Sequence, residues 1–368
     1  MPTSRRHAIP NLPTPDFTYD PHAAGACVAG VRPFRNGSYR LDSELASGRF
    51  VVHNYGHGGA GITLSWGCAA KVAEIVKKRI AVSHDTQVAV LGAGVMGLTA
   101  ATLLRDLGLE VTIYADRNPV ETTSHKAGGQ WAVSVVAFAG KEQELKGIIK
   151  TSYTTFKNSI GAGFGVSEVP NYSREVTPGL EVVRRLAPGL MPERESLMRM
   201  PFENHTKPGF KYQTLLVEPP IFLLRLENDL SARGVTIEPR QFISKSDVFS
   251  SLPQKVIVNC TGMGAKKLWN DQDMEPIKGQ LAMLPKQPAL KYLYGQDGYM
   301  FPRSDAVIIG STFEVGVDNE TIDPAKCKSL VRHIAALFGQ AVPVAMPEYH
   351  IHHPRNARLF DPTLPTGV

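Results

Sequence analysis

QVAVLGAGVMGLTAATLLRDLGLEVTIYAD, residues 87–116, is the segment from which the expected architecture follows. It reads as an apolar strand, a glycine turn, a helix and a second apolar strand that ends in an acid. Gly92 allows the tight turn, Gly94 lets the backbone approach a pyrophosphate, and Gly97 permits close packing of the helix on the strand. Asp116 is placed to accept a hydrogen bond from a ribose hydroxyl. The stretch predicts a βαβ unit that binds a dinucleotide, without choosing between FAD and NAD.

Further residues near this unit suit a nucleotide. An arginine follows the acid, and a run of three hydroxyl residues could serve phosphate or ribose oxygens, although such a run is also a common helix N-cap or turn. A later apolar strand ends in a Thr-Gly pair, which suits a sheet edge that a cofactor approaches. These candidate nucleotide ligands are Arg117, Thr122, Thr123, Ser124, Thr261 and Gly262.

The composition is that of an ordinary globular protein. The chain has 368 residues, a length that favours two interleaved domains because one core rarely grows beyond about 250 to 300 residues. The net charge of +6 comes from scattered Lys and Arg, so we expect no nucleic-acid partner. The four cysteines lack metal-ligand spacing, which predicts neither a zinc site nor disulfides. No apolar run of about 18 residues and no secretory leader appear, so we expect a cytoplasmic protein without membrane contact.

A second glycine-rich turn lies upstream, in VVHNYGHGGAGITLSWGCAAKVAEIVKK, residues 51–78. Four glycines crowd one turn between an apolar strand and an amphipathic helix. Such a turn exposes backbone N–H groups to a flat ligand, and the helix that follows points its positive end at the same place. An isoalloxazine ring gains from this arrangement, because negative charge builds on its pyrimidine end when it is reduced. The candidate flavin contacts in and after the turn are Gly58, Gly59, Gly61, Ile62 and Thr63.

These motifs resemble those of one enzyme family. VRPFR (31–35), HNYGHGGAG (53–61) and WGCA (66–69) are similar to the closing signature of D-amino acid oxidases and D-aspartate oxidases. GAGVMGL, YADR, TTS with Gly129 and Trp131, VNCTG, GQ and GYMFP resemble the remaining blocks of that family. In the family the dinucleotide unit opens the chain and HNYGHGG closes it, whereas here the closing block comes first. The order predicts a circular permutation, with a short connection, residues 81–86, between the helix after WGCA and the first strand of the dinucleotide unit.

The resemblance implies roles for particular residues. Arg32 matches the arginine that grips the substrate carboxylate with both arms of its guanidinium, and Tyr299 matches a tyrosine that donates to the same carboxylate. A second tyrosine is expected where this chain has Gly295, and Tyr294 beside it could stand in. Weaker substrate-pocket candidates are Gln213 and Ala60. Arg35 is expected to be structural.

The resemblance also bears on the cofactor and on catalysis. It implies FAD, with Gly129 among its contacts. His53 and His57 are not expected to act as bases, because the α-hydrogen leaves as hydride to flavin N5 and the enzyme contributes orientation. Cys68 is expected to be a buried structural cysteine, which predicts non-covalent FAD.

The fold expected is α/β, a circularly permuted D-amino acid oxidase fold. It comprises a Rossmann-like FAD domain (31–140 and 218–262) interleaved with a mixed-sheet α+β substrate domain (141–217 and 263–368), with residues 1–25 as an extended arm. The activity expected is oxidation of a D-amino acid, preferably small or neutral, by O2 to an imino acid and hydrogen peroxide.

Three alternatives remain open at this stage. One is a related flavin oxidase acting on glycine, a secondary amine or a biosynthetic intermediate. Another is a flavin-binding protein without turnover, and the third is an NAD-dependent dehydrogenase. A homodimer is possible, including one in which residues 1–80 complete the site of a second protomer.

Overall fold

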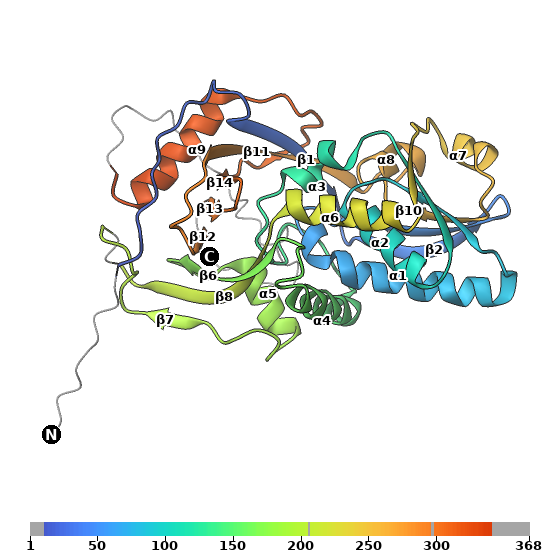
Figure 1. The fold of residues 1–368 in the computed structure, drawn as a ribbon, viewed down its shortest axis with the longest axis horizontal. Helices are drawn as coiled ribbons and strands as arrows, with labels where there is room; N and C mark the ends of the chain where they lie inside the picture. Colours follow the sequence, from blue (N-terminus) through green and yellow to red (C-terminus); the bar gives the residue numbers. More distant parts are fainter. Residues whose placement is uncertain (1–10, 205–206, 296–297, 341–368) are drawn as a thin grey trace.

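The computed structural model describes residues 11–204, 207–295 and 298–340. Within these ranges the strands form two sheets, which lie side by side along the long axis of the molecule (Figure 1). The smaller sheet has the order β2-β3-β10-β4-β5-β9, and every neighbouring pair in it is parallel except β2 with β3. Its strands are β2 (Arg40–Ala46), β3 (Arg49–Tyr55), β10 (Val256–Asn259), β4 (Gln87–Leu91), β5 (Glu110–Ala115) and β9 (Thr236–Pro239).

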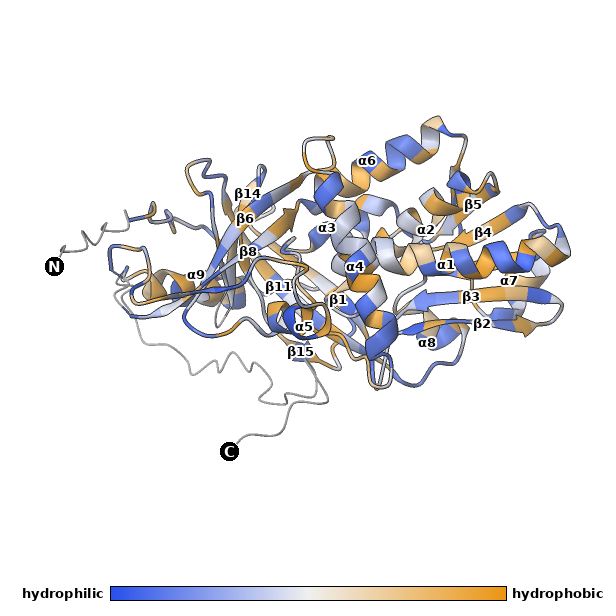
Figure 2. Ribbon diagram, turned by 90° about the horizontal axis from the view of Figure 1, so that it is seen from below, coloured by the Kyte–Doolittle hydropathy of each residue, from blue (hydrophilic) through white to orange (hydrophobic). Residues whose placement is uncertain are grey.

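Helices cover both faces of the smaller sheet. On one face Val88 and Val90 of β4 share a buried cluster with α1 (Gly61–Ser83) and α2 (Val95–Asp106). On the other face Ala89 and Leu91 pack in a cluster with α7 (Lys245–Ser251) and α8 (Gly264–Leu268). This burial on both faces explains why β4 is a continuous apolar run instead of an alternating one. Hydrophilic and hydrophobic residues follow one another along α1 (Figure 2).

The larger sheet is mostly antiparallel and has the order β1-β11-β14-β13-β12-β6-β8-β7, with β15 also paired to β11. Its strands are β1 (Cys27–Arg35), β11 (Met274–Pro285), β14 (Ala306–Gly310), β13 (Tyr299–Pro302), β12 (Leu293–Gly295), β6 (Val166–Ser173), β8 (Gly209–Val217), β7 (Glu195–Leu197) and β15 (Glu314–Val315). The helix α9 (Pro324–Leu337) buries Leu330 and Ile334 against Val307 and Ile309 of β14. The remaining helices are η1 (Pro119–Glu121), α3 (Thr123–Lys126), α4 (Glu142–Asn158), α5 (Pro178–Leu186) and α6 (Pro219–Ala232).

Residues 27–83 contribute to both sheets. The strand β1 pairs with β11 in the larger sheet, and β3 pairs with β10 in the smaller one, where Ile257 lies between Val51 and Ala89. The helix α1 packs against α2 and α4. The connection expected at residues 81–86 is shorter in the structure, because α1 continues to Ser83 and ends at His84, whose N–H donates to the Ile80 carbonyl. Only residues 84–86 therefore join α1 to β4.

The expected domain boundaries and the expected N-terminal arm can be compared with the elements of the structure. The range expected to start the FAD domain at residue 31 begins inside β1, and α4, expected in the substrate domain, packs against α1. The segment 11–25 has neither helix nor strand, yet Leu12, Phe17 and Tyr19 pack on the cluster beneath α9. Residues 1–10 of the expected arm lie outside the described ranges. In the part of the chain that the structure describes, no helix is long and apolar enough to cross a membrane.

Candidate active site

A cavity of about 690 Å³ is lined by residues from both sheets. The larger sheet contributes β1, β11 and β13, and the smaller sheet contributes the ends of β3, β4 and β5 and the residues that follow β10. Most of the residues expected at the substrate and cofactor sites line this single cavity. They are Arg32, Gly58, Gly59, Gly61, Ile62, Thr63, Gly92, Gly94, Asp116, Arg117, Thr122, Thr123, Ser124, Gly129, Thr261, Gly262 and Tyr299.

One end of the cavity is the glycine turn between β4 and α2. Gly92 has a φ of +103°, and a Cβ there would lie 2.5 Å from the Cys260 carbonyl oxygen. Gly97 does not line the cavity, because it packs the helix on the strand: a Cβ at this position would lie 1.9 Å from the Gly92 carbonyl oxygen. The Ser124 hydroxyl accepts from the first N–H of α2, that of Val95, at 3.2 Å. The turn thus brings backbone close to the cavity at the positive end of a helix.

The second glycine turn differs in one respect from the sequence-based expectation. The N–H of Gly58 donates to the Pro33 carbonyl at 2.9 Å and the N–H of Gly59 donates to the Val135 carbonyl at 3.0 Å, so neither is available to a ligand. The turn runs so tightly over residues 134–135 that a Cβ on Gly58 would lie 1.9 Å from the Val135 carbonyl oxygen. In the described residues, the N–H groups of the first turn of α1, 61–63, have no acceptor. The donors that face the cavity therefore belong to the helix that follows the turn.

Arg32 enters the cavity from β1. Its Nη2 donates to the Ser311 hydroxyl at 2.7 Å, and no acidic side chain in the described ranges pairs with the guanidinium. Its Nη1 is buried and has no hydrogen-bond partner in those ranges. The guanidinium lies against Gly279 of β11, where a Cβ would be 2.4 Å from Nη2. Burial lowers the pKa of Arg32, as expected for a cation removed from water without a compensating anion.

Tyr299 enters the same part of the cavity from β13. Its ring stacks on Phe301 with 4.2 Å between the ring centroids. Two glycines make room for the ring: a Cβ on Gly310 would lie 2.3 Å from it, and one on Gly128 would lie 2.9 Å from it. Burial raises the pKa of Tyr299, and the charge of Arg32 partly offsets that rise. Tyr299 is therefore a neutral hydroxyl beside an uncompensated cation, a pair suited to bind an anion.

A family model describing FAD dependent oxidoreductases (DAO) matches residues 87–355, more than half of the chain. The chain belongs to this family. It is accordingly an FAD-dependent oxidoreductase, similar in sequence to curated amino acid oxidases. A D-amino-acid oxidase of Rubrobacter xylanophilus is 28% identical over 259 residues, covering 67% of this chain and 76% of the relative. A D-amino-acid oxidase of Streptomyces coelicolor is 27% identical over 272 residues, covering 69% of this chain and 78% of the relative.

Solved structures share the fold at lower identity. The glycine oxidase of Geobacillus kaustophilus is 17% identical with a TM-score of 0.51, covering 71% of this chain and 81% of that chain. The L-α-glycerophosphate oxidase of Mycoplasma pneumoniae with FAD bound is 18% identical with a TM-score of 0.51, covering 67% and 78%. These likenesses show the fold of FAD-dependent oxidases.

The cavity of this oxidoreductase fits FAD. The turn at residues 92–94 and the N-terminus of α2 can receive a diphosphate, and Asp116 follows β5 at the cavity wall, where it can receive a ribose hydroxyl. The N–H groups at residues 61–63 of α1, which have no acceptor in the described residues, lie after the second glycine turn, where they can donate to a flavin. The cavity that these groups line has a volume of about 690 Å³. The backbone N–H donors and the volume of the cavity are therefore suited to an anionic dinucleotide such as FAD.

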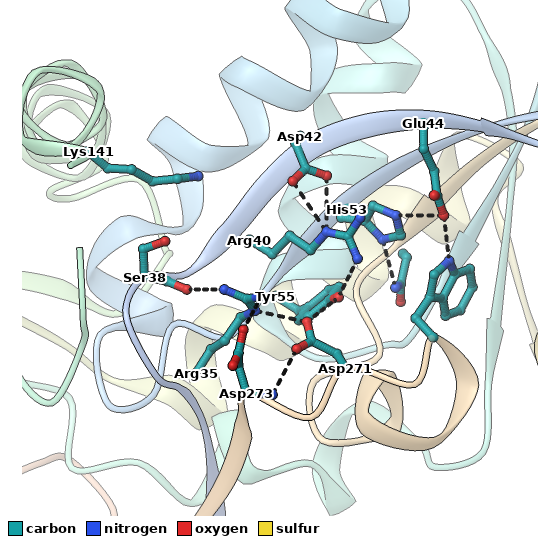
Figure 3. A network of polar contacts seen from close by, with 12 residues as sticks. Arg35, Ser38, Arg40, Asp42, Glu44, His53, Tyr55, Lys141, Asp271 and Asp273 are labelled. Carbon is teal, nitrogen blue, oxygen red and sulfur yellow. Dashed lines mark hydrogen bonds and ion pairs between the residues drawn. The ribbon is translucent and has the colours of Figure 1, made fainter. Parts of the chain in front are cut away.

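A polar network distinguishes Arg35 from Arg32 on the same strand. Arg35 pairs with Asp271 and with Asp273, each at 2.8 Å, and Tyr55 donates to Asp271 at 2.8 Å (Figure 3). The network ties β1 to the loop before β11 and to β3 of the smaller sheet. Arg35 thus has the structural environment that the sequence suggested, whereas Arg32 has no acidic partner among the residues that the structure describes.

The two histidines of the glycine turn are buried and neutral. Burial lowers the pKa of His53 to about 4 and that of His57 to about 3. His53 lies in the network of Figure 3, between Glu44 at 3.3 Å and Asn259 at 3.1 Å. His57 stacks on Tyr39, with 5.1 Å between ring centroids, and its Nε2 lies 3.4 Å from the Cys68 sulfur. Cys68 itself is buried and is not among the residues that line the cavity.

Three substrate-pocket candidates do not line the cavity, namely Gln213, Tyr294 and Ala60. Tyr294 lies opposite Met300 in the β12–β13 hairpin, whereas Gly295 lies opposite Tyr299. Directly opposite residues share a face of a sheet, so Tyr294 points to the other face, into the cluster with Met300 and Phe338. Gln213 lies opposite Pro170 in the β6–β8 pair, and Ala60 is fully buried before α1.

Several cavity features were not anticipated from the sequence. Ser311 holds Arg32, and Gly279 provides the space for its guanidinium. Glu320, on the loop before α9, pairs with Lys126 of α3 at 2.7 Å and with Arg117 at 3.2 Å. Gly279 lies in the GQ motif, which does not say which neighbours meet, and Ser311 belongs to none of the motifs that the sequence analysis singled out. Glu320 carries no sequence signal, because an acid in a polar loop is usually solvated.

Proposed function

We propose that this oxidoreductase is an FAD-dependent oxidase of D-amino acids. The observation that carries the proposal is the buried Arg32 guanidinium, which lies without an anionic partner in the described residues, beside Tyr299 and at the cavity that fits FAD. A buried cation without a counter-ion destabilises the folded protein unless a ligand supplies the opposite charge. A planar carboxylate does so well, because it can accept two parallel hydrogen bonds from the planar guanidinium group. The D configuration is supported by the names of the curated relatives and by the motifs shared with that family.

In this proposal the protein acts by orientation. Arg32 and Tyr299 hold the substrate carboxylate, and Phe301, Leu281 and the ring of Tyr299 form an apolar wall for a small or neutral side chain. Bound FAD supplies the chemistry of accepting the α-hydrogen as hydride and passing the electrons to O2, which yields imino acid and hydrogen peroxide. No protein base is needed for that step, in keeping with the structural contacts of His53 and His57. Holding the reacting atoms in line can by itself lower the activation free energy by several kcal/mol.

The proposed cofactor contacts follow from the cavity. The diphosphate would lie at Gly92, Gly94 and Ser124, the ribose at Asp116, and the flavin at the first turn of α1. Other lining residues assigned to FAD are Arg117, Thr122, Thr123, Gly129, Thr261, Gly262, Gly58, Gly59, Gly61, Ile62 and Thr63. Because Cys68 is buried away from the cavity lining, the cofactor would be non-covalent.

We also propose that the chain is a circular permutation of the family's usual order, with two domains centred on the two sheets. Two contacts support this: Gln340 donates to the Pro15 carbonyl at 3.1 Å, and the rings of Phe338 and Phe17 lie 5.7 Å apart. The residues after α9 thus meet the segment that leads into β1, as they would if the two had once been continuous.

A re-ordered chain tests the permutation. It would start at residue 85, run to residue 340, pass through a flexible linker to residue 15, and end at residue 84. Active, FAD-loaded enzyme is expected, because the closure cost rises by only about 0.6 kcal/mol for each doubling of linker length. An insoluble product that never binds FAD would contradict the proposed order.

A peroxide assay tests the activity. The purified enzyme would be offered both enantiomers of the common amino acids, glycine and N-methylglycine, under air. Peroxide release with D-amino acids and not with their L enantiomers supports the proposal. Release with glycine or N-methylglycine alone would favour the second candidate, an oxidase of glycine or secondary amines, which the glycine oxidase fold and Gly295 at the Tyr299 face both allow.

A further inference from the structure

Asn54 lines the cavity with a side-chain carboxamide that the protein does not satisfy. The side chain is fully buried, in the next-to-last residue of β3. Neither its Nδ2 nor its Oδ1 has a hydrogen-bond partner among the residues that the structure describes. Buried polar groups are nearly always hydrogen-bonded, because an unmade bond costs the desolvation of the group. The Asn54 carboxamide therefore has both a donor and an acceptor without a protein partner.

The neighbouring strand β10 carries a second asparagine whose side chain is satisfied. Asn259 is also fully buried, and its Nδ2 lies 3.1 Å from His53 Nδ1. Its Oδ1 accepts from the Thr261 N–H at 3.2 Å and from the Thr261 hydroxyl at 2.7 Å. Cys260, the next residue, has only a thiol, which is a weak donor and a weak acceptor. The unsatisfied carboxamide is thus particular to Asn54 and is not shared by the asparagine beside it.

The alternation of side chains along β3 directs Asn54 to the face of the sheet that α1 and α2 cover. Val52, two residues earlier, packs in the buried cluster that contains residues of both helices. His53 lies on the opposite face, where its ring and that of Trp269 have centroids 5.6 Å apart. Residues i and i+2 of a strand share a face, so the Asn54 side chain is on the side of α1 and α2.

This place lies close to both of the sites proposed for parts of FAD. The strand β3 leads directly into the second glycine turn and the first turn of α1, where we propose that the flavin binds. The diphosphate turn after β4 is two strands away, roughly 10 Å, because β10 lies between β3 and β4. The first turns of α1 and α2 are adjacent, since a Cβ on Gly61 would lie 3.7 Å from Val95 Cγ1.

The part of FAD that joins the flavin to the diphosphate is the ribityl chain, which carries hydroxyl groups. A hydroxyl both donates and accepts, so it can use both functions of a carboxamide. An ionised phosphate oxygen only accepts and would leave Oδ1 of Asn54 unsatisfied. The pair of unsatisfied atoms therefore favours the ribityl chain over the diphosphate.

We propose that Asn54 binds the ribityl chain of FAD, donating from Nδ2 to one hydroxyl oxygen and accepting a hydroxyl hydrogen at Oδ1. Asn54 is then a cofactor contact that fixes the segment between the flavin and the diphosphate. The inference rests on the proposed placement of FAD in the cavity. It does not depend on which substrate the enzyme oxidises.

Binding of FAD and of ADP to the full-length apoprotein tests the inference. ADP contains the adenosine and the diphosphate of FAD but has no ribityl chain and no flavin. Losing one or two hydrogen bonds predicts an FAD Kd about 5- to 30-fold higher in Asn54→Ala, measured by fluorescence titration. The ADP Kd of the same variant, measured by calorimetry, should stay within about twofold of wild type.

The melting temperature of the apoprotein separates a cofactor contact from a structural one. Removing an unsatisfied carboxamide breaks no hydrogen bond within the protein, so apo Asn54→Ala should melt at or above the wild-type temperature. Asn259→Ala is the matched control, because it removes the hydrogen bonds with His53 and Thr261, and it should melt at a lower temperature. Saturating FAD should raise the melting temperature of Asn54→Ala by less than that of wild type.

Three results would overturn the role of Asn54. One is an unchanged FAD Kd in Asn54→Ala, and another is an equal rise of the FAD and ADP Kd values, which would place Asn54 at the diphosphate or the nucleoside. The third is an apo melting temperature that falls as far as that of Asn259→Ala, which would make the side chain structural. If Asn54→Ala does not fold, Asn54→Val, whose branched side chain suits a strand, is expected to show the same selective rise of the FAD Kd.

A second substitution separates this inference from the placement of the cofactor and from the proposed activity. Asp116→Ala should raise the Kd of both FAD and ADP, because both ligands contain the adenosine ribose. If it raises neither, the proposed placement of FAD is refuted, and the role of Asn54 with it. A selective loss of FAD affinity in Asn54→Ala supports the inference even if the enzyme oxidises no D-amino acid, so failure of the proposed activity is recognised separately.

Discussion

Gly279→Ala should damage the substrate site while leaving the cofactor in place. A Cβ on Gly279 would lie 2.4 Å from Nη2, 2.5 Å from Nη1 and 2.6 Å from Cζ of Arg32. Ordinary carbon contacts need about 3.5 Å, so the guanidinium must move by about 1 Å. The backbone of Gly279 does not have a positive φ, so the change acts through this contact and not through backbone strain.

The size of the effect follows from that displacement. A misplacement of about 1 Å in a group that orients the substrate can cost up to about 100-fold in rate. We therefore expect kcat/KM for D-alanine to fall about 10- to 100-fold, or about 1.4 to 2.7 kcal/mol of transition-state stabilisation. The flavin absorbance spectrum and the FAD content should stay as in wild type.

A matched glycine provides the control. Gly147 lies in the helix α4, and a Cβ there would meet nothing within 4 Å. Gly147→Ala should keep wild-type kcat/KM and stabilise the helix by about 0.5 to 1 kcal/mol. A Gly279→Ala enzyme that is folded, holds FAD and keeps kcat/KM within twofold of wild type would refute the placement of Arg32 against Gly279.

Changes at Arg32, Glu320 and His57 should each have a distinct effect. Arg32→Lys should lower kcat/KM by about 100-fold with the flavin spectrum unchanged, because lysine lacks the planar fork; steady-state kinetics with unaltered efficiency would remove Arg32 from the site. Glu320→Gln should raise the FAD Kd about two- to fivefold in a fluorescence titration, because the ion pairs of Glu320 with Lys126 and Arg117 hold the loop before α9 against α3. Tighter FAD binding would show that Lys126 and Arg117 bind the cofactor instead. Burial lowers the pKa of His57 to about 3, so below about pH 6.5 the unfolded state binds a proton that the folded state does not. The melting temperature should therefore fall as the pH drops from about 6.5 toward 4.5, and it should fall less steeply in His57→Asn. The same dependence of melting temperature on pH in both proteins would exclude His57 as its source.

The parts of the fold that depend on local pattern were predictable from the sequence. The strand, glycine turn, helix and acid of residues 87–116 are short-range features, and β4, α2 and β5 form as that pattern indicates. Gly97 could be assigned to helix-strand packing for the same reason. Local pattern could not show that the N–H groups of Gly58 and Gly59 are already bonded, because their acceptors belong to Pro33 and Val135.

The site itself depends on contacts between distant parts of the chain. Arg32 and Tyr299 meet because β1, β11, β14 and β13 are consecutive in the larger sheet, an order that no spacing in the sequence reveals. The family resemblance suggested this pair, but it could not settle the face of Tyr294. A shift of one residue in a strand turns a side chain to the opposite face, and the hairpin register places Gly295, not Tyr294, beside Tyr299.

Anaerobic reduction of the bound flavin isolates the step that the site is proposed to orient, the transfer of hydride from the substrate. The absorbance of the holoenzyme would be followed after mixing with D-alanine or L-alanine in the absence of O2. The proposed site predicts rapid loss of flavin absorbance with D-alanine, none with L-alanine, and a much slower loss with D-alanine in Arg32→Lys. No bleaching by any D-amino acid, or equal rates for wild type and Arg32→Lys, would contradict it.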